Sequence, residues 1–133
     1  MGAWDSDPFG NDNACDWVYE AEQATDLSFI AKTIENIHEQ GGDDLEGAEE
    51  AIAAADTLAR LKGNFYVRNA YTESIDEWVA KHPITPPQGL LDSAIRAIDR
   101  ILTPPSEPLE IWKNSTEFAK WKKHLTDLQD RLR

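Results

Sequence analysis

Residues 43–64 read DDLEGAEEAIAAADTLARLKGN, an alanine-rich segment that starts with clustered acids and ends at Gly63-Asn64. Its apolar residues recur every three or four positions, which predicts a helix with one seam of small side chains. The seam consists of Ala48, Ile52, Ala55 and Ala59. Small residues at this spacing let a neighbouring helix approach closely. Asp43 and Glu46 are spaced as a capping pair for this helix, and Gly63-Asn64 is expected to end it.

Helical periodicity continues on both sides of this segment. It covers residues 27–37, 75–79, 91–102 and 118–132, and a further helix is expected to carry Trp17. Thr72 is the expected cap of the helix at 75–79, and residues 109–112 are expected to form a short turn. Residues 83–87 and 104–108 are proline-rich and predict rigid corners. The sequence therefore predicts an all-α fold, an irregular bundle of five to six helices in one domain over residues 1–133.

The start of the chain combines large apolar side chains with short polar ones. Trp4, Phe9 and Trp17 are expected to pack on the core as an aromatic strap, and burial of each contributes about 2 kcal/mol. Asn11 or Asp12 is expected to cap the helix that carries Trp17. We therefore predict a mainly structural role for this N-terminal motif.

Charge is unevenly distributed along the chain. Residues 1–59 hold fifteen acids and one base, residues 60–133 hold ten acids and twelve bases, and the net charge is −12. Such a local excess repels nucleic acid and anionic lipid and attracts a basic partner. Cys15 is the single cysteine, and no apolar run is long enough to cross a bilayer. These features predict a cytoplasmic protein with no membrane or nucleic-acid partner, and no motif predicts a cofactor.

The acids are most compact at the start of the alanine-rich segment. The predicted partner-binding residues are Asp43, Asp44, Glu46, Glu49 and Glu50. Complementary charge raises association rates above the roughly 10⁵–10⁶ M⁻¹s⁻¹ of neutral pairs. The leading hypothesis is a protein-binding module, and specifically an immunity protein that neutralises a basic toxin. Two observations keep alternatives open: acidic helices also confer solubility, and part of the acidic face could pair with the bases of residues 60–133.

An enzyme and a non-catalytic adaptor are the alternative hypotheses. Glu46-x-x-Glu49 and Glu73-x-x-Asp76 resemble the paired acidic motifs of the all-α, magnesium-dependent nucleoside triphosphate pyrophosphatases related to MazG. In those enzymes carboxylates on facing helices hold the metal ions that bind the triphosphate and activate water. Glu46, Glu49, Glu73 and Asp76 are therefore the candidate magnesium ligands. The competing interpretation of the same acids is capping and solubility.

The N-terminal sequence also carries a family resemblance. Met1-Gly2-Ala3-Trp4, Phe9, Asn11-Asp12, Ala14 and Asp16-Trp17 resemble the start of a bacterial family known as domain of unknown function 4259. The resemblance continues through residues 94–102, 106–112 and 121–132, and it adds Asp16 to the N-terminal motif. Asp5 and Asp7 stand where that family tends to have glycine. The family implies no established activity, and small acidic proteins of this kind are often immunity or interaction proteins.

Overall fold

The described part of the chain, residues 7–66 and 68–133 of a computed structural model, folds into seven α-helices and contains no strand. The helices are α1 (Asp12–Ala21), α2 (Ser28–His38), α3 (Ala48–Leu61), α4 (Glu73–Lys81), α5 (Gln88–Ile101), α6 (Glu107–Lys113) and α7 (Phe118–Leu132). The all-α prediction is confirmed. The predicted count of five to six is one too low, because the expected turn at residues 109–112 is part of α6. None of the described helices is both long and apolar enough to cross a membrane.

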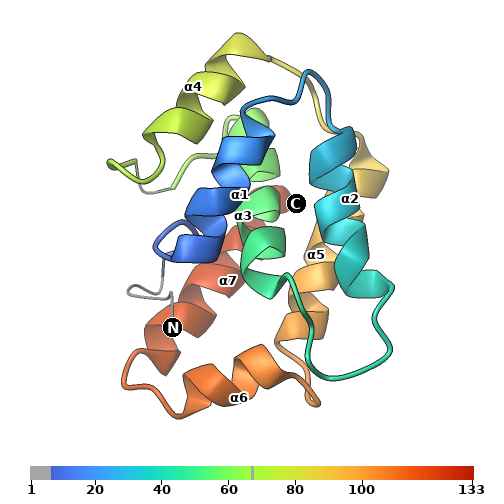
Figure 1. Cartoon of the computed structure of the whole chain (residues 1–133), viewed down its shortest axis with the longest axis vertical. Coiled ribbons are helices and arrows are strands. Elements are labelled where there is room, and N and C mark those ends of the chain that lie inside the picture. Colours follow the sequence, from blue (N-terminus) through green and yellow to red (C-terminus); the bar gives the residue numbers. More distant parts are fainter. Residues whose placement is uncertain (1–6, 67) are drawn as a thin grey trace.

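Helix α3 lies at the centre of the fold, with α1, α2, α4, α5 and α7 packed around it (Figure 1). Eleven of its fourteen residues are buried, including Ala53, Ala54 and Ala59 at 0% exposure. Alanine side chains allow helices to approach from several directions at once, since they add little bulk to the helix surface. The sequence predicted that α3 contacts a neighbour along a single seam of small residues. The contact surface is wider than predicted, because α3 is covered on nearly every side.

Helix α3 ends where the sequence predicted. The backbone N–H of Asn64 donates to the carbonyl of Ala59 (2.9 Å), and that of Gly63 donates to the carbonyl of Arg60 (2.9 Å). Gly63 has φ +90°, a left-handed conformation that glycine adopts without a Cβ clash. This pair of bonds is the Schellman arrangement that satisfies the last carbonyls of a helix.

The start of α3 differs from the prediction. Its N-cap residue is Gly47, with φ +83°, and no side chain caps the helix there. Asp43 and Glu46 do not form the expected capping pair, because Leu45 and Gly47 both have positive φ and turn the chain before the helix begins. Thr72 precedes α4 as predicted, but its hydroxyl donates to Asp76 Oδ2 (3.0 Å) rather than capping the helix.

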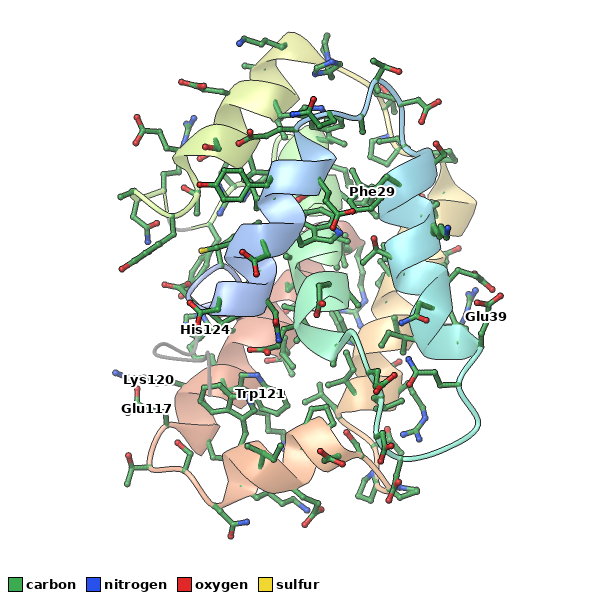
Figure 2. All side chains as sticks on the ribbon, in the orientation of Figure 1. Phe29, Glu39, Glu117, Lys120, Trp121 and His124 are labelled. Carbon is green, nitrogen blue, oxygen red and sulfur yellow. The ribbon has the colours of Figure 1, made fainter. Side chains whose placement is uncertain are left out.

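The N-terminal aromatic residues that can be described are buried in the core. Phe9 is 3% and Trp17 is 4% exposed, whereas Trp4 lies outside the described residues. Trp17 belongs to α1, and its ring stacks on Phe29 at a centroid distance of 5.6 Å. Phe29 lies on α2, on the side that faces α1 (Figure 2). The indole N–H of Trp17 donates to Thr33 Oγ1 at 2.9 Å, so the ring joins α1 to α2.

The cap of α1 is Asn11, one of the two residues predicted for it. Its side-chain oxygen accepts a hydrogen bond from the backbone N–H of Ala14 at 2.7 Å, and Asn11 is itself buried. Asp12 follows in the first turn, where a negative charge is favoured by the helix dipole. Asp12 and Asp16 are both exposed, so the structural part of this polar motif is carried by Asn11.

Helix α6 is positioned by its own cap and by a pair of stacked tryptophans. Ser106 is buried, accepts from the N–H of Leu109 (3.3 Å) and donates to the carbonyl of Ile101 (2.6 Å). The ring of Trp112 on α6 lies parallel to that of Trp121, with ring centroids 5.5 Å apart. Trp121 lies on the side of α7 that faces α6 (Figure 2). These contacts place α6 across the end of the bundle where α3 begins (Figure 1).

Candidate partner-binding groove

A groove of about 670 Å³ lies between the start of α3, the start of α6 and the first turn of α1. Three of the five predicted acids line it: Asp44, Glu49 and Glu50. A fourth acid, Glu107 of α6, also lines it and was not predicted as a site residue. Asp43 and Glu46 are exposed outside the lining. We refer to Asp44, Glu49, Glu50 and Glu107 as the groove acids.

The loop before α3 forms one wall of the groove. Leu45 has φ +49°, an uncommon conformation for a bulky residue, and its side chain is buried at 2% exposure. Two side chains hold the loop backbone: Asn36 of α2 and Gln40, two residues beyond the end of α2, both donate to the carbonyl of Glu46, at 2.9 and 2.6 Å. Burial of Leu45 and these bonds fix the loop, and Asp44 beside it faces the groove.

A second backbone bond fixes α6 relative to the loop. The N–H of Glu107 donates to the carbonyl of Asp43 at 2.7 Å. The backbone of Asp43 thus has a structural role, while its carboxylate is exposed outside the groove lining. This bond brings the first turn of α6 beside the first turn of α3, although the two helices are far apart in sequence.

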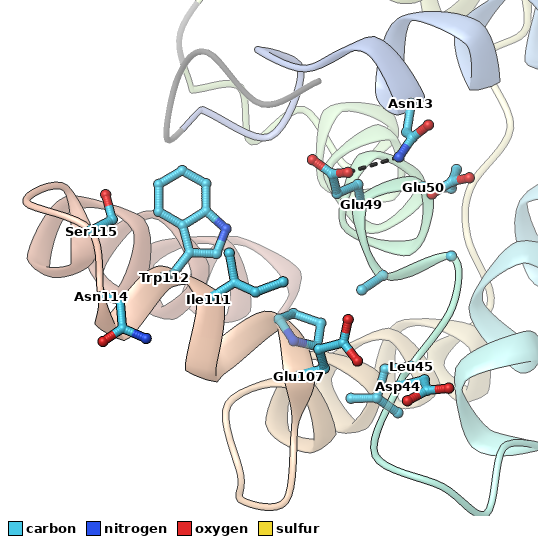
Figure 3. Close-up of a pocket in the computed structure, with 13 residues that line it drawn as sticks. Asn13, Asp44, Leu45, Glu49, Glu50, Glu107, Ile111, Trp112, Asn114 and Ser115 are labelled. Carbon is cyan, nitrogen blue, oxygen red and sulfur yellow. Dashed lines mark hydrogen bonds between the residues drawn. The ribbon is translucent and has the colours of Figure 1, made fainter. Parts of the chain in front are cut away.

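Beyond Glu107, α6 presents apolar side chains to the groove. Ile111 is 54% exposed and Trp112 is half-buried (Figure 3). The ring of Trp112 also stacks on the ring of Trp121. Pro108, Leu45 and Ala48 complete the apolar lining. The groove therefore combines carboxylates with accessible apolar surface, a combination that suits a partner carrying both basic and apolar side chains.

The groove acids have no basic neighbour in the lining. Among the described residues that form the groove there is no lysine or arginine. Glu49 accepts a hydrogen bond from Asn13 Nδ2 at 2.8 Å (Figure 3). Burial nevertheless raises the pKa of Glu49, and the nearby charge of Glu50 adds to this effect while the Asn13 bond opposes it. A cation entering the groove would relieve this unfavourable charge.

At the other end of α3 the acids are paired. Asp56 is 0% exposed and bonds Arg60 Nε (2.8 Å) and Arg131 of α7 (2.9 Å). Arg60 also bonds Asp76 of α4 at 2.8 Å, and its guanidinium lies 5.4 Å from the ring centroid of Phe9. This cluster joins α3, α4 and α7, and we refer to Asp56, Arg60, Asp76 and Arg131 as the buried ion cluster.

The four candidate magnesium ligands are not brought together. Glu46 and Glu49 lie at the start of α3, whereas Asp76 is held by Arg60 near its end. Eleven residues separate Glu49 from Arg60, a rise of about 16 Å at 1.5 Å per residue. Glu73 lines a different surface depression with Asp76. In the part of the chain that the structure describes, no three acidic, histidine or cysteine side chains are grouped to hold a metal ion.

Sequence reasoning missed the groove residues contributed by α1 and α6. Asn13, Glu107, Ile111 and Trp112 come from segments far from residues 43–50, so local periodicity could not group them. One signal for α6 was present: Ser106 followed by Glu107-Pro108 is typical of a helix start, with a capping hydroxyl, an acid and an early proline.

The chain belongs to a known family. It matches the family described as a domain of unknown function (DUF4259) over residues 2–124, which includes every groove residue and most of the buried ion cluster. The family inferred from the sequence is thereby confirmed. No curated protein and no solved structure shows significant similarity to the chain.

Proposed function

We propose that this protein is an acidic binding module that takes up a basic protein in the groove at the start of α3, and that it acts in the cytoplasm as an immunity protein against a basic toxin. The observation that carries the proposal is the groove itself: four carboxylates without a basic neighbour in the described lining, beside the exposed side chain of Ile111.

Charge supports this assignment of the groove. Asp56 lies in the core and pairs with two arginines, whereas no ion pair of Asp44, Glu49, Glu50 or Glu107 with a base is observed among the described residues. The groove acids therefore keep a negative field directed at solvent. Such a field speeds the approach of a basic protein, and the apolar wall then provides contact area that salt does not screen.

Binding to the basic surface of the toxin would itself inhibit the toxin. A toxin that acts on nucleic acid or nucleotides carries a basic surface for its substrate, and a protein bound to that surface blocks it. Immunity genes commonly lie beside the gene of their toxin. The product of the neighbouring gene is therefore the partner to test first.

Co-expression with that product tests the proposal. The two proteins should co-purify, and growth inhibited by the neighbour's product alone should be restored when both are present. The triple variant Asp44→Lys, Glu50→Lys, Glu107→Lys should lose both properties.

A control variant with the same change in net charge is available outside the groove. Glu35, Glu39 and Glu73 are exposed, and their replacement by lysine should leave co-purification and growth rescue intact. If the neighbour's product is harmless and does not co-purify with the wild-type chain, the immunity function is wrong. If both triple variants behave alike, the groove is not the binding surface.

A further inference from the structure

A second groove adjoins the first. It has a volume of about 430 Å³ and lies between α1 and α2. Asn13, Gly47 and Glu50 line both grooves, so the two grooves meet at these residues, and we refer to them together as the joined groove. The joined groove runs from Ile111 on α6, past the start of α3, to Glu20 on α1.

The second groove repeats the chemistry of the first. Phe29, which lines this groove, supplies its accessible aromatic surface, and its ring stacks on the buried ring of Trp17. Trp17 is only 4% exposed and its indole N–H is bonded to Thr33, so the half-buried Phe29 is the aromatic side chain that a ligand can reach here. Asp16 and Glu20, both exposed, supply carboxylates along its edge.

The one base in the described lining of the joined groove is Lys32, on the α2 side. No ion pair of Lys32 is observed with the described acids, so the carboxylates of Asp16 and Glu20 remain open to an incoming cation. Six carboxylates thus line the joined groove, at Asp16, Glu20, Asp44, Glu49, Glu50 and Glu107.

The shape of this surface indicates a linear occupant. Asn13 and Glu20 are seven residues apart on α1, which adds about 10 Å of length beyond the shared point. Two apolar contact regions, at Ile111–Trp112 and at Phe29, are separated by the acids at the start of α3. A partner helix presents side chains at i, i+3, i+4 and i+7 to such a groove, with apolar anchors at both ends and cations between them.

We infer that the joined groove binds one continuous, basic, amphipathic segment of the partner protein, with apolar side chains on the two aromatic regions and lysine or arginine facing Glu49 and Glu50. This inference rests on the proposed function, because it specifies which part of a basic partner enters the same groove. It adds α1 and α2 to the binding surface.

Two synthetic peptides provide the probe. Both have the same composition of lysine and leucine; one has leucines at i, i+3, i+7 and i+10 with lysines elsewhere, and the other is a scrambled sequence. Fluorescence anisotropy with the full chain should show that the patterned peptide binds about tenfold more tightly than the scrambled one, since only the patterned peptide places apolar anchors on one face.

Single charge reversals then map the surface. Glu20→Lys at one end and Glu107→Lys at the other should each weaken binding of the patterned peptide about fivefold, because each removes an attraction and adds a repulsion. Glu39→Lys, which makes the same charge change on the exposed end of α2, should change the affinity less than about twofold.

Each other outcome overturns the inference. If all three variants weaken binding equally, the peptide is attracted by the net charge of the protein alone. If both peptides bind with equal affinity, the apolar side chains do not act as anchors. Weakening by Glu107→Lys but not by Glu20→Lys would restrict binding to the first groove. None of these results affects co-purification with the neighbour's product, so the proposed function is tested separately.

Discussion

At the C-terminal end of α3, Asp56 is fully buried and bonds two arginines, whereas at the N-terminal end Glu49 and Glu50 line a groove in which the described residues include no base. The same helix thus holds acidic side chains in two different environments. A buried carboxylate is tolerated only when its charge is compensated by close partners. A carboxylate at the surface needs no partner, and it costs little stability to leave it unpaired.

The difference separates acids that hold the fold together from acids available to another molecule. Asp56 joins α3 to α7 through Arg131, a residue 75 positions away in the sequence. The groove acids form no observed ion pair with a described base that would link two helices. The pKa of Glu49 is accordingly raised by burial and not lowered by an ion pair. Substitutions at the two ends should therefore affect different properties.

The largest expected effect on stability comes from the buried ion cluster. Asp56→Ala removes the shared partner of Arg60 and Arg131 and leaves Arg131 without a carboxylate in the cluster. Breaking a buried pair in this way costs about 3–5 kcal/mol of unfolding free energy. Urea unfolding followed by circular dichroism measures the loss.

The matched control for this substitution is Asp44→Ala in the groove. Asp44 is exposed, so the change should be within about 0.5 kcal/mol. A similar loss at both positions would mean that the two ends of α3 do not differ in the way described. If Asp56→Ala does not fold, Arg131→Met removes one arginine while keeping the apolar stem and should give a smaller, measurable loss.

A smaller effect is expected from the backbone at the groove end. Gly47 has φ +83°, and a Cβ added there would lie 2.9 Å from Asn36 Nδ2. Gly47→Ala should therefore lower the unfolding free energy by about 1–2 kcal/mol, through strain in the left-handed conformation. Gly89→Ala is the control, because a Cβ at Gly89 meets nothing within 4 Å. An unchanged stability in Gly47→Ala would show that the loop before α3 can adopt another conformation.

The smallest effect on stability is expected at Glu49, where removing the charge should raise the unfolding free energy instead of lowering it. Its raised pKa means that the folded chain binds this proton more tightly than the unfolded chain. The charged form is therefore destabilising above the raised pKa, and stability is recovered as the pH falls through that pKa towards the ordinary value of 4.5.

Glu49→Gln keeps an oxygen that can accept from Asn13 but carries no charge. It should raise the unfolding free energy at pH 7 by about 0.5 kcal/mol or less, and the gain should disappear below pH 4.5. Thermal unfolding of the variant and the wild type at pH 7 and pH 4 checks the sign. A loss of stability at pH 7 that persists at pH 4 would contradict the description of Glu49 as an uncompensated charge.

Local patterns made much of the fold predictable. The apolar face of α5, the stripe of α7 and the Gly63-Asn64 end of α3 depend on residues within one or two turns of each other, and these features were predicted correctly. The burial of α3 on nearly every side was not predicted, because the sequence pattern does not reveal how many neighbours surround an alanine-rich helix. The predicted cap at the start of α3 was wrong, because the chain there depends on a positive φ at Leu45, which the sequence gives no reason to expect.

The candidate site was predicted in part for the same reason. Asp44, Glu49 and Glu50 are close in sequence, and the structure places them in one groove. Glu107 and Ile111 reach that groove only because α6 folds back across the bundle, which no local pattern describes. Asp56 and Arg60 have the i, i+4 spacing of a helical ion pair, but their links to Arg131 and Asp76 depend on tertiary packing.

The most direct test of the difference between the two ends of α3 is the association rate constant with the neighbour's product, measured by stopped-flow over a salt series. The quadruple variant Asp44→Asn, Glu49→Gln, Glu50→Gln, Glu107→Gln should associate about tenfold more slowly than the wild type at low salt, and with a weaker salt dependence. A variant with four exposed acids changed elsewhere, Glu35→Gln, Glu39→Gln, Glu73→Gln and Glu77→Gln, should associate at a rate close to that of the wild type. Equal rates and equal salt dependence for all three proteins would contradict the account, because the groove acids would then have no role in binding.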